Sequence, residues 1–207
     1  AINILHEEFF ETTYKQVNLF ISGVGNVGSK LLAQLEQQSD FLQQQLNIQV
    51  KVTGISNSRK MLIDEEGISP GQWKEKLDNG HPAILQDFVD QVVARNLRNS
   101  VFVDVTANAE VAAVYEQLLE KSVAVVACNK VAASSSFDNY KKLKDLAREY
   151  NCQFLFETNV GAGLPIIATL NDLVHSGDRV HKIQAVLSGT LNFVFNNYDG
   201  SRKFADV

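Results

Sequence analysis

The chain has 207 residues, of which 45% are hydrophobic and 21% are charged, and its formal net charge is −5. These values are typical of a folded globular protein with room for one domain and part of another. The basic residues are scattered, so charge gives no reason to expect a nucleic acid or a membrane as partner. There is no apolar run of the roughly 20 residues that a membrane span needs, and no secretory signal, so we expect a cytoplasmic protein.

Apolar runs and turn residues alternate along the chain in an order that predicts strands and helices following one another. We expect strands over residues 17–22, 48–55, 101–105, 123–127, 153–156 and 180–187. We expect helices after the glycine-rich turn at 23–28, with a kink or restart at Ser39–Asp40, and over 88–97, 110–121, 137–150, 166–174 and 190–195. Residues 57–82 are polar, and we expect no sheet strand there. The pattern predicts an α/β fold, a Rossmann-type doubly wound and mainly parallel sheet, with a soft domain boundary near Gly161.

The turn Gly23-Val24-Gly25-Asn26-Val27-Gly28 joins the first expected strand to the first expected helix. In such a turn the first glycine allows a tight bend, the second lets the backbone approach a pyrophosphate, and the third lets the helix pack on the sheet. The helix N-terminus adds free N–H groups and the positive end of a dipole. This context predicts a dinucleotide site formed by all six residues, the alternative being a fortuitous glycine-rich turn.

The end of the second expected strand indicates which dinucleotide is preferred. NAD-selective proteins carry an Asp or Glu there, roughly 20 residues beyond the glycines, to bind the ribose 2′-hydroxyl. This sequence has Ser56-Asn57 followed by Ser58, Arg59 and Lys60. A missing acid and two cations suit a 2′-phosphate. We therefore expect Ser58, Arg59 and Lys60 to contact NADP, with NAD as the alternative cofactor and a solvated pair of cations as the alternative explanation.

Polar residues also follow three later strands, where ligands of open parallel sheets bind. They are Asp104–Asn108, Asn129-Lys130 and Glu157-Thr158-Asn159. Lys130 is placed to bind a carboxylate or to assist proton transfer, a solvated surface lysine being the alternative. The irregular segment 157–165 holds two glycines and a proline, and its carbonyls beside a carboxylate suit a hard cation, although a plain loop is the alternative.

The order of these motifs, together with Ser188-Gly189-Thr190-Leu191-Asn192, resembles homoserine dehydrogenases from about residue 17 to the end of the chain. The stretch 157–165 carries the most specific part of the resemblance. Residues 1–16 resemble the linker before this domain in bifunctional aspartokinase/homoserine dehydrogenases. The resemblance implies a linker-like segment at 1–16, an NAD(P)-binding domain at 17–160, and the incomplete beginning of an α+β substrate and dimerisation domain at 161–207.

The resemblance further implies NAD(P)-dependent interconversion of L-homoserine and L-aspartate 4-semialdehyde, a step toward threonine and methionine. It implies that Lys130 lies between nicotinamide and substrate, and that Thr106 and Ala107 lie beside the cofactor. It also implies a sodium-like cation, which is held by Glu157, Val160, Ala162 and Leu164.

A later segment of the family, which supplies homoserine contacts and a proton-transferring lysine, has no counterpart in this chain. The chain also starts without a Met and stops at Val207 without a terminating feature. We therefore expect a piece cut from a longer protein, inactive by itself, whose parent is a homo-oligomer; the assembly of the piece is left open. Another NADP-dependent semialdehyde reductase and a non-catalytic dinucleotide-binding module are the alternatives.

Overall fold

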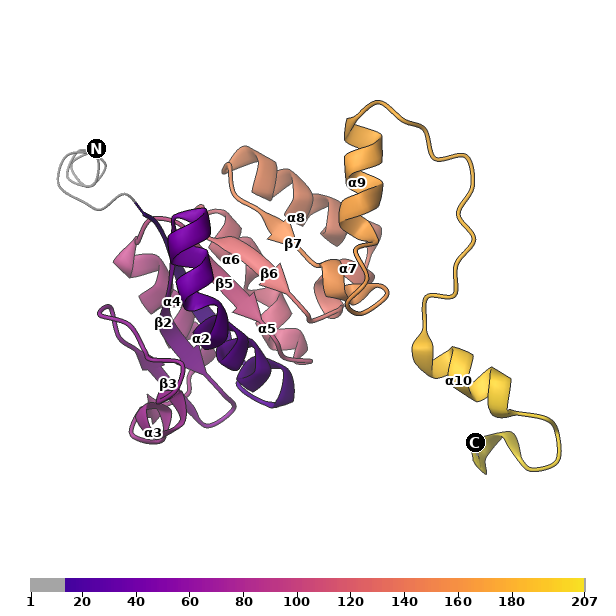
Figure 1. Ribbon diagram of the computed structural model, residues 1–207, viewed down its shortest axis with the longest axis horizontal. Helices are drawn as coiled ribbons and strands as arrows, with labels where there is room; N and C mark the ends of the chain where they lie inside the picture. The colour runs from indigo at the N-terminus through magenta and orange to yellow at the C-terminus, as the bar shows by residue number, and fades with distance from the viewer. Residues whose placement is uncertain (1–13, 207) are drawn as a thin grey trace. The chain divides into compact units, whose positions relative to one another are not determined.

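The computed structural model describes residues 14–206, which divide into two compact units, residues 14–155 and 156–206 (Figure 1). The strands of the first unit are Lys15–Ser22 (β1), Ile48–Ser56 (β2), Lys60–Ile63 (β3), His81–Pro82 (β4), Ser100–Asp104 (β5), Ala124–Ala127 (β6) and Phe154–Leu155 (β7). Its helices are Asn26–Leu46 (α2), Trp73–Asp78 (α3), Leu85–Arg95 (α4), Ala109–Ala113 (α5), Tyr115–Leu119 (α6), Val131–Ser134 (α7) and Phe137–Glu149 (α8). The second unit contains Ile167–His175 (α9), Gly189–Asn197 (α10) and the short 3-10 turns Glu157–Asn159 and Phe204–Asp206.

The seven strands form one sheet in the order β4-β3-β2-β1-β5-β6-β7. Five strands, β2, β1, β5, β6 and β7, run parallel, whereas β3 and β4 pair antiparallel at one edge. After β1, the chain adds β2 on one side of it and later adds β5 on its opposite side. This reversal makes the carboxyl ends of β1 and its neighbours the expected ligand site of a doubly wound fold. The predicted fold class is confirmed.

The register of the parallel strands brings their carboxyl ends level with one another. Ser22, the last residue of β1, pairs with Ser56 at the end of β2 and with Asp104 at the end of β5. Asp104 in turn pairs with Ala127 at the end of β6. The loops that follow these strands therefore all leave the sheet at the same edge.

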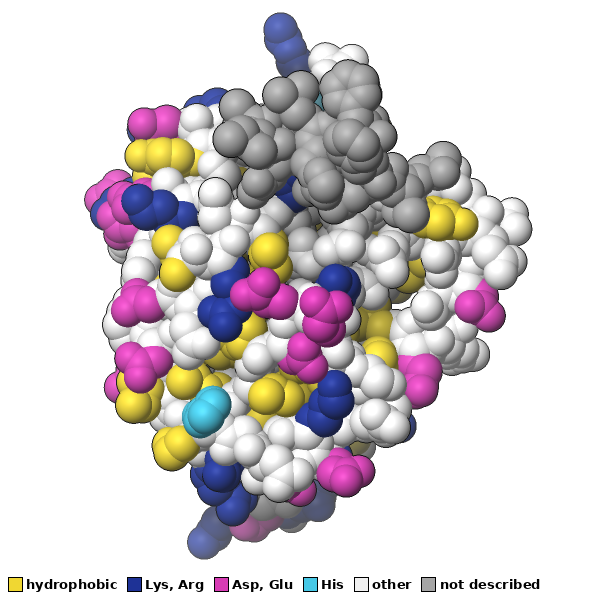
Figure 2. All heavy atoms as spheres, turned by 90° about the vertical axis from the view of Figure 1, so that its left-hand side faces the viewer, with side chains coloured by type: hydrophobic (Ala, Val, Ile, Leu, Met, Phe, Trp, Pro, Cys, Tyr) yellow, Lys and Arg dark blue, Asp and Glu magenta, His cyan; other side chains and the backbone are white. Residues whose placement is uncertain are grey.

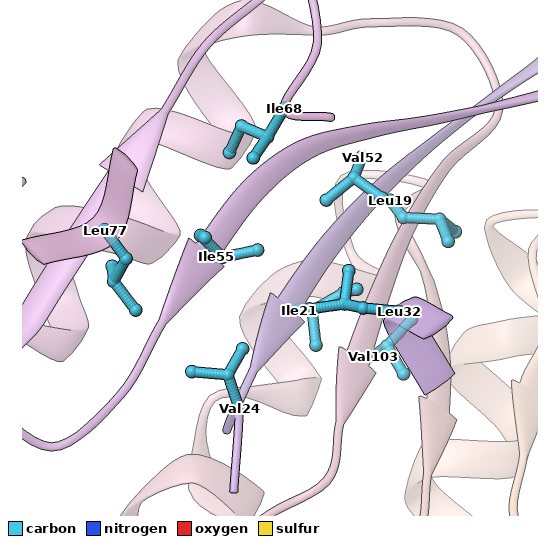
Figure 3. Close-up of a cluster of buried hydrophobic side chains, with 9 residues drawn as sticks. All are labelled: Leu19, Ile21, Val24, Leu32, Val52, Ile55, Ile68, Leu77 and Val103. Carbon is cyan, nitrogen blue, oxygen red and sulfur yellow. The ribbon is translucent and has the colours of Figure 1, made fainter. Parts of the chain in front are cut away.

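Helices cover the two faces of the central strands, which is why residues 18–22 of β1 are buried in succession. On one face, Leu19 and Ile21 of β1 pack with Leu32 of α2 in a buried cluster that Figure 3 shows. On the other face, Phe88 of α4 lies against Phe102 of β5, with ring centroids 6.4 Å apart. On β5, Phe102 thus lies on one face and its neighbour Val103 belongs to the cluster on the other, as the period of a strand requires.

The segment 57–82 differs from the sequence prediction, because it contains two strands. Lys60–Ile63 pairs antiparallel with the end of β2, and His81–Pro82 pairs with Lys60 and Met61. The prediction of no strand here was wrong because β3 has only four residues, of which Met61 alone is buried. Strands added at the edge of an existing sheet need few apolar residues, so the sequence pattern does not reveal them.

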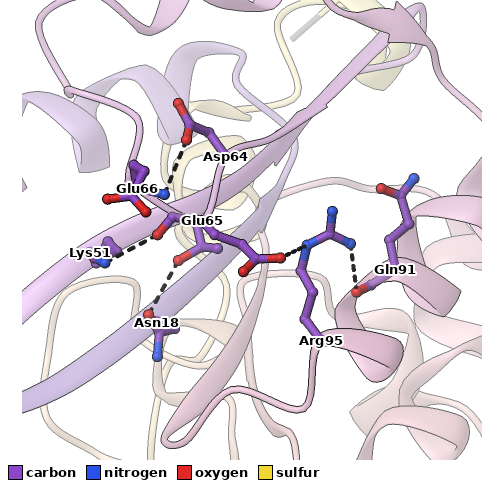
Figure 4. A network of polar contacts seen from close by, with 8 residues as sticks. Asn18, Lys51, Asp64, Glu65, Glu66, Gln91 and Arg95 are labelled. Carbon is purple, nitrogen blue, oxygen red and sulfur yellow. Dashed lines mark hydrogen bonds and ion pairs between the residues drawn. The ribbon is translucent and has the colours of Figure 1, made fainter.

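A polar network holds the connection after β3 against β2 and α4 (Figure 4). The ammonium of Lys51 donates to the carbonyl of Glu65 at 3.1 Å. The Glu65 carboxylate pairs with the guanidinium of Arg95 at 3.0 Å, and Arg95 also donates to the carbonyl of Gln91. These contacts fix the segment that leads from β3 into α3.

Three further predictions differ from the structure. One uninterrupted helix spans Asn26–Leu46, so no new helix begins at Ser39–Asp40. The expected helix over 110–121 is two short helices that meet at Val114. The expected strand over 180–187 is not formed within the described residues, because a strand needs a pairing partner and residues 156–206 supply none.

None of the helices within residues 14–206 is long and apolar enough to cross a membrane. Figure 2 shows one face of the molecule, on which acidic and basic side chains are interspersed rather than gathered into patches of one sign.

Candidate dinucleotide-binding site

A cleft of about 550 Å³ lies at the carboxyl ends of β1, β2 and β5 in the first unit. Its walls come from the glycine turn, the β2–β3 turn, the start of α4, and the segment from β5 into α5. They are Ser22, Gly23, Val24, Gly25, Ser56, Asn57, Ser58, Met61, Ala83, Ile84, Leu85, Phe88, Val105, Thr106, Asn108, Glu110 and Val111. The structure therefore brings together Gly23, Val24, Gly25, Ser58 and Thr106 from the residues expected at the cofactor.

The three glycines of the turn meet different surroundings. Gly23 has a φ of +96°, and a Cβ there would lie 2.9 Å from the Thr106 methyl group. A Cβ at Gly28 would lie 2.1 Å from the Gly23 carbonyl oxygen, so a side chain there would force the turn and the helix apart. Around Gly25 nothing lies within 4 Å of the Cβ position. The turn is thus tightly packed at both ends and open at its middle.

The open middle coincides with the N-terminus of α2. Gly25 precedes the helix, and its carbonyl accepts the first intrahelical bond from the Ser29 amide at 2.9 Å. The amides of Asn26, Val27 and Gly28 therefore have no carbonyl one turn before them within the helix. The first turn of α2 carries no acidic residue. Free N–H groups and an unopposed helix dipole beside an open glycine suit a phosphate group.

The β2–β3 turn is shaped by Asn57, whose side-chain oxygen accepts from the amides of Arg59 and Lys60, each at 2.7 Å. This arrangement places Ser58 in the cleft wall. Arg59 lies exposed on the same turn, outside the lining residues. The Lys60 ammonium donates to the carbonyl of Gly80 at 3.0 Å and joins the start of β3 to the residue before β4.

The ends of β5 and β6 are joined through the buried carboxylate of Asp104. One oxygen accepts from the Thr106 amide at 2.8 Å, and the other accepts from the Asn129 side chain at 2.9 Å. Ala107 follows Thr106 but does not line the cleft. Lys130 is exposed at the start of α7 and also lies outside the cleft wall.

Sequence reasoning missed the third partner of Asp104, the hydroxyl of Tyr115, which donates to it at 2.6 Å. Burial raises the pKa of Tyr115 far above its usual value, and the negative charge of Asp104 raises it further. The hydroxyl therefore stays protonated as a donor. A signal was present in the sequence, because Tyr115 belongs to the apolar stripe of its helix and a buried hydroxyl needs a partner.

In the second unit, Glu157 caps a helix. Its two carboxylate oxygens accept from the amides of Ile167 and Ala168 at 2.8 and 2.7 Å, at the start of α9. Ala162 has a φ of +53°, and the amide of Leu164 donates to the carbonyl of Gly161. No cluster of three or more His, Cys, Asp or Glu suited to a metal occurs within the described residues. A site formed mainly by backbone carbonyls at Val160, Ala162 and Leu164 stays a prediction.

The fold, the packed glycine turn and the cleft at the strand ends define a dinucleotide-binding domain of the doubly wound α/β class. Comparison with protein families agrees with this definition and narrows it. The homoserine dehydrogenase NAD-binding domain matches residues 23–157, and the homoserine dehydrogenase family matches residues 165–207. The chain belongs to the homoserine dehydrogenase family.

Individual relatives agree with the family. The chain is 40% identical over its whole length to the chloroplastic bifunctional aspartokinase/homoserine dehydrogenase 2 of Arabidopsis thaliana, and it covers 23% of that protein. It is 34% identical to the bifunctional enzyme of Haemophilus influenzae, of which it covers 25%. A hyperthermophilic archaeal homoserine dehydrogenase solved in complex with NADPH is 26% identical, with a TM-score of 0.63 over 75% of this chain and 48% of that one. The chain thus spans about a quarter of the curated relatives it matches most fully.

Proposed function

We propose that the cleft binds NADP and that this region serves the interconversion of L-homoserine and L-aspartate 4-semialdehyde. The observation that carries the proposal is the contrast between Gly25, which is open, and Gly23 and Gly28, which are packed. An open glycine before a helix N-terminus provides room for a pyrophosphate. Membership of the family and the NADPH bound to the archaeal relative support the choice of ligand.

The residues present fit a dinucleotide. The amides at the start of α2 would hold the pyrophosphate, and the β2–β3 turn would hold the adenosine half. The nicotinamide half would extend past Thr106 and Ala107 toward the end of β6 and Lys130. When bound, the nicotinamide supplies or accepts the hydride. The role of this chain is to orient the cofactor, and Lys130 would bind the substrate or assist a proton transfer at its hydroxyl.

Within the β2–β3 turn, Arg59 is the residue best suited to select NADP. Ser58 lies in the cleft wall, and Arg59 follows it with an exposed guanidinium able to bind a phosphate with two hydrogen bonds. The Lys60 ammonium already donates to Gly80 and adds charge rather than a contact of its own. We therefore propose that Ser58 and Arg59 contact the 2′-phosphate and that Lys60 stabilises the turn.

Calorimetric titration of the 207-residue chain with NADPH and NADH tests this proposal. We expect NADPH to bind more tightly, and Arg59→Ala to weaken NADPH binding by about tenfold or more, the value of a charge-assisted hydrogen bond, without changing NADH binding. Lys60→Ala is the matched control, with a smaller effect on the ratio of the two affinities. Equal affinities for the two cofactors in the unsubstituted chain would contradict the choice of NADP.

We also propose that this chain by itself does not oxidise homoserine. Reactive sites exclude water with buried walls, and no residue of the described segment 156–206 is buried. Measuring NADPH formation with homoserine tests this directly. Turnover by the 207-residue chain would contradict it, and turnover with a different semialdehyde would favour another reductase of the same chemistry.

The cation proposal rests on the loop 157–164. Glu157 supplies a carboxylate and the loop supplies irregular backbone carbonyls, which is the chemistry of a hard monovalent cation. The two N–H bonds to Glu157 leave lone pairs on its oxygens for such an ion. We propose a sodium-like ion at Glu157, Val160, Ala162 and Leu164, tested by whether sodium, but not the bulky tetramethylammonium ion, raises the melting temperature.

A further inference from the structure

Four segments of the first unit meet at one buried carboxylate. Asp104 is 0% exposed at the end of β5, in the middle of the sheet edge that carries the cleft. Its oxygens accept from the Thr106 amide, the Tyr115 hydroxyl and the Asn129 side-chain amide, at 2.8, 2.6 and 2.9 Å. All three groups donate and none accepts, so residue 104 needs an acceptor atom at both positions that the carboxylate oxygens occupy.

Asn129 extends this connection beyond β5. Its side chain is 2% exposed, and the nitrogen that donates to Asp104 also donates to the carbonyl of Asn108 at 2.8 Å. Its side-chain oxygen accepts from the amide of Val131 at 3.1 Å, in the first residue of α7. One side chain therefore joins the loop after β5 to the residues on either side of Lys130.

We infer that Asp104 and Asn129 are positioning residues, which lock the ends of β5 and β6 together and thereby fix Thr106 and Lys130 relative to each other on the nicotinamide side of the site. The inference rests on the proposed function, because it assigns that side of the cleft to nicotinamide. It adds a role for two residues that contact neither the cofactor nor the substrate in that proposal.

The topology supports this assignment of sides. The dinucleotide of a doubly wound fold crosses the point where the strand order reverses, with its adenosine half over the strand that follows the glycine turn. That strand is β2, so the opposite half extends over β5 and β6. Thr106 and Lys130 follow these two strands. The β5–β6 pairing ends at Asp104 and Ala127, and one further backbone bond, from the Cys128 amide to the Asp104 carbonyl, lies beyond it. The Asp104 and Asn129 side chains continue the connection where the ladder stops.

A carboxylate is the right group for this position, and its isosteric amide is not. In Asp104→Asn the amide nitrogen would face either the Thr106 amide or the Tyr115 and Asn129 donors. In both orientations two donors would meet, and one buried hydrogen bond would be lost. An apolar core residue would fill the same space without directing any loop, whereas fully satisfied buried polar groups specify one arrangement.

Backbone amide exchange in the free chain tests the lock without any cofactor. We expect Asp104→Asn to accelerate exchange by about tenfold at Thr106, if the new amide nitrogen faces the Thr106 amide, or at Val131, if it faces Asn129 and releases that side chain. Asn129→Ala should accelerate Val131 and leave Thr106 nearly unchanged. Tyr115→Phe is the matched control, because it removes a bond to the same carboxylate but not to either loop. Unchanged exchange at both Thr106 and Val131 in Asp104→Asn would overturn the inference, because Asn129→Ala removes the acceptor of the Val131 amide whether or not the lock exists.

The functional half of the inference is tested by binding NADPH and adenosine 2′,5′-bisphosphate, which carries only the adenosine half. We expect Asp104→Asn and Asn129→Ala to weaken NADPH by about tenfold and the bisphosphate by less than about twofold. A structural role alone would weaken both ligands equally, and that result, or no change in either, would overturn it. If the unsubstituted chain bound neither ligand, the proposed function and its assignment of sides would fail, while amide exchange would still decide whether the lock exists.

Discussion

The two units of the chain have similarly apolar sequences but differ in what they bury. In the first unit, β1 has five successive buried residues, 18–22, and Phe20 is 0% exposed. In the second, no residue of the described segment 156–206 is buried, although Ile183, Val186 and Phe195 are apolar and Phe195 is 66% exposed. Apolar sequence therefore produces a core only where neighbouring elements cover it.

The helices of the second unit show what local hydrogen bonds achieve without a core. Glu157 caps the start of α9, and the Ser188 hydroxyl oxygen accepts from the amide of Leu191 at the start of α10. A helix satisfies its own backbone, so such caps suffice to define its start. A strand cannot do so, and the segment 180–187 forms none. The contrast separates structure specified locally from structure that needs a partner.

Core substitutions would break this comparison most directly. We expect Phe20→Ala to lower the free energy of unfolding by about 3–5 kcal/mol, because it leaves a cavity between β1 and α4. Phe195→Ala should change it by less than about 0.5 kcal/mol, because the ring is exposed. Urea denaturation of both variants measures the difference. Equal losses would show that the second unit buries its aromatic residues in solution.

Two glycines sharpen the comparison within the first unit. Gly28→Ala should destabilise the chain by about 1–3 kcal/mol, since its Cβ would overlap the Gly23 carbonyl. Gly25→Ala should leave the free energy of unfolding within about 0.5 kcal/mol, because its Cβ has open space, yet it should weaken NADPH binding. Thermal denaturation with and without NADPH separates the two. A destabilised Gly25→Ala would contradict the assignment of open space to a ligand.

Alkaline pH should weaken the first unit through Tyr115. Its pKa is raised in the folded chain, chiefly by burial, so above about pH 10, the usual tyrosine pKa, the unfolded chain releases a proton that the folded chain keeps. The contribution of Tyr115 to the free energy of unfolding is therefore fully present below that pH, and it should fall by about 1.4 kcal/mol per pH unit above it. Tyr115→Phe should remove this part of the decline. An identical alkaline slope in urea denaturation of the two proteins would disprove the role of Tyr115.

The smallest effect is expected in the second unit. Val186 is 77% exposed, so Val186→Lys should change the free energy of unfolding by less than about 0.5 kcal/mol. Denaturation against urea again provides the measurement. A loss of several kcal/mol would mean that residues 180–187 pair with a partner in solution and that the contrast between the units is smaller than the structure shows.

The sequence predicted the structure well where only one residue type can adopt the local geometry. The positive φ of Gly23 and the close contact at Gly28 can be met only by glycine, so the turn was recognisable with its flanking strand and helix. The long buried strands were equally clear. The antiparallel pair of β3 and β4 was not, because edge strands of four and two residues carry too few apolar positions to show a period.

The interior of the site was only partly predictable. Asp104 and Asn129 were expected at strand ends, but their mutual hydrogen bond depends on the register between β5 and β6, which no local pattern encodes. The role of Tyr115 required knowing which face of α6 meets the sheet. In the same way, the hydrogen bond from the Lys60 ammonium to the Gly80 carbonyl joins residues 20 positions apart, which no local pattern predicts.

The edge strands of the sheet bear on how this domain avoids aggregation. The outermost strands, β4 and β7, have two residues each, and one of the two in β4 is Pro82, which has no amide hydrogen to donate. Exposed ladders recruit strands from other molecules, and short or proline-containing margins suppress this. The two outermost strands therefore offer little template to a neighbouring chain.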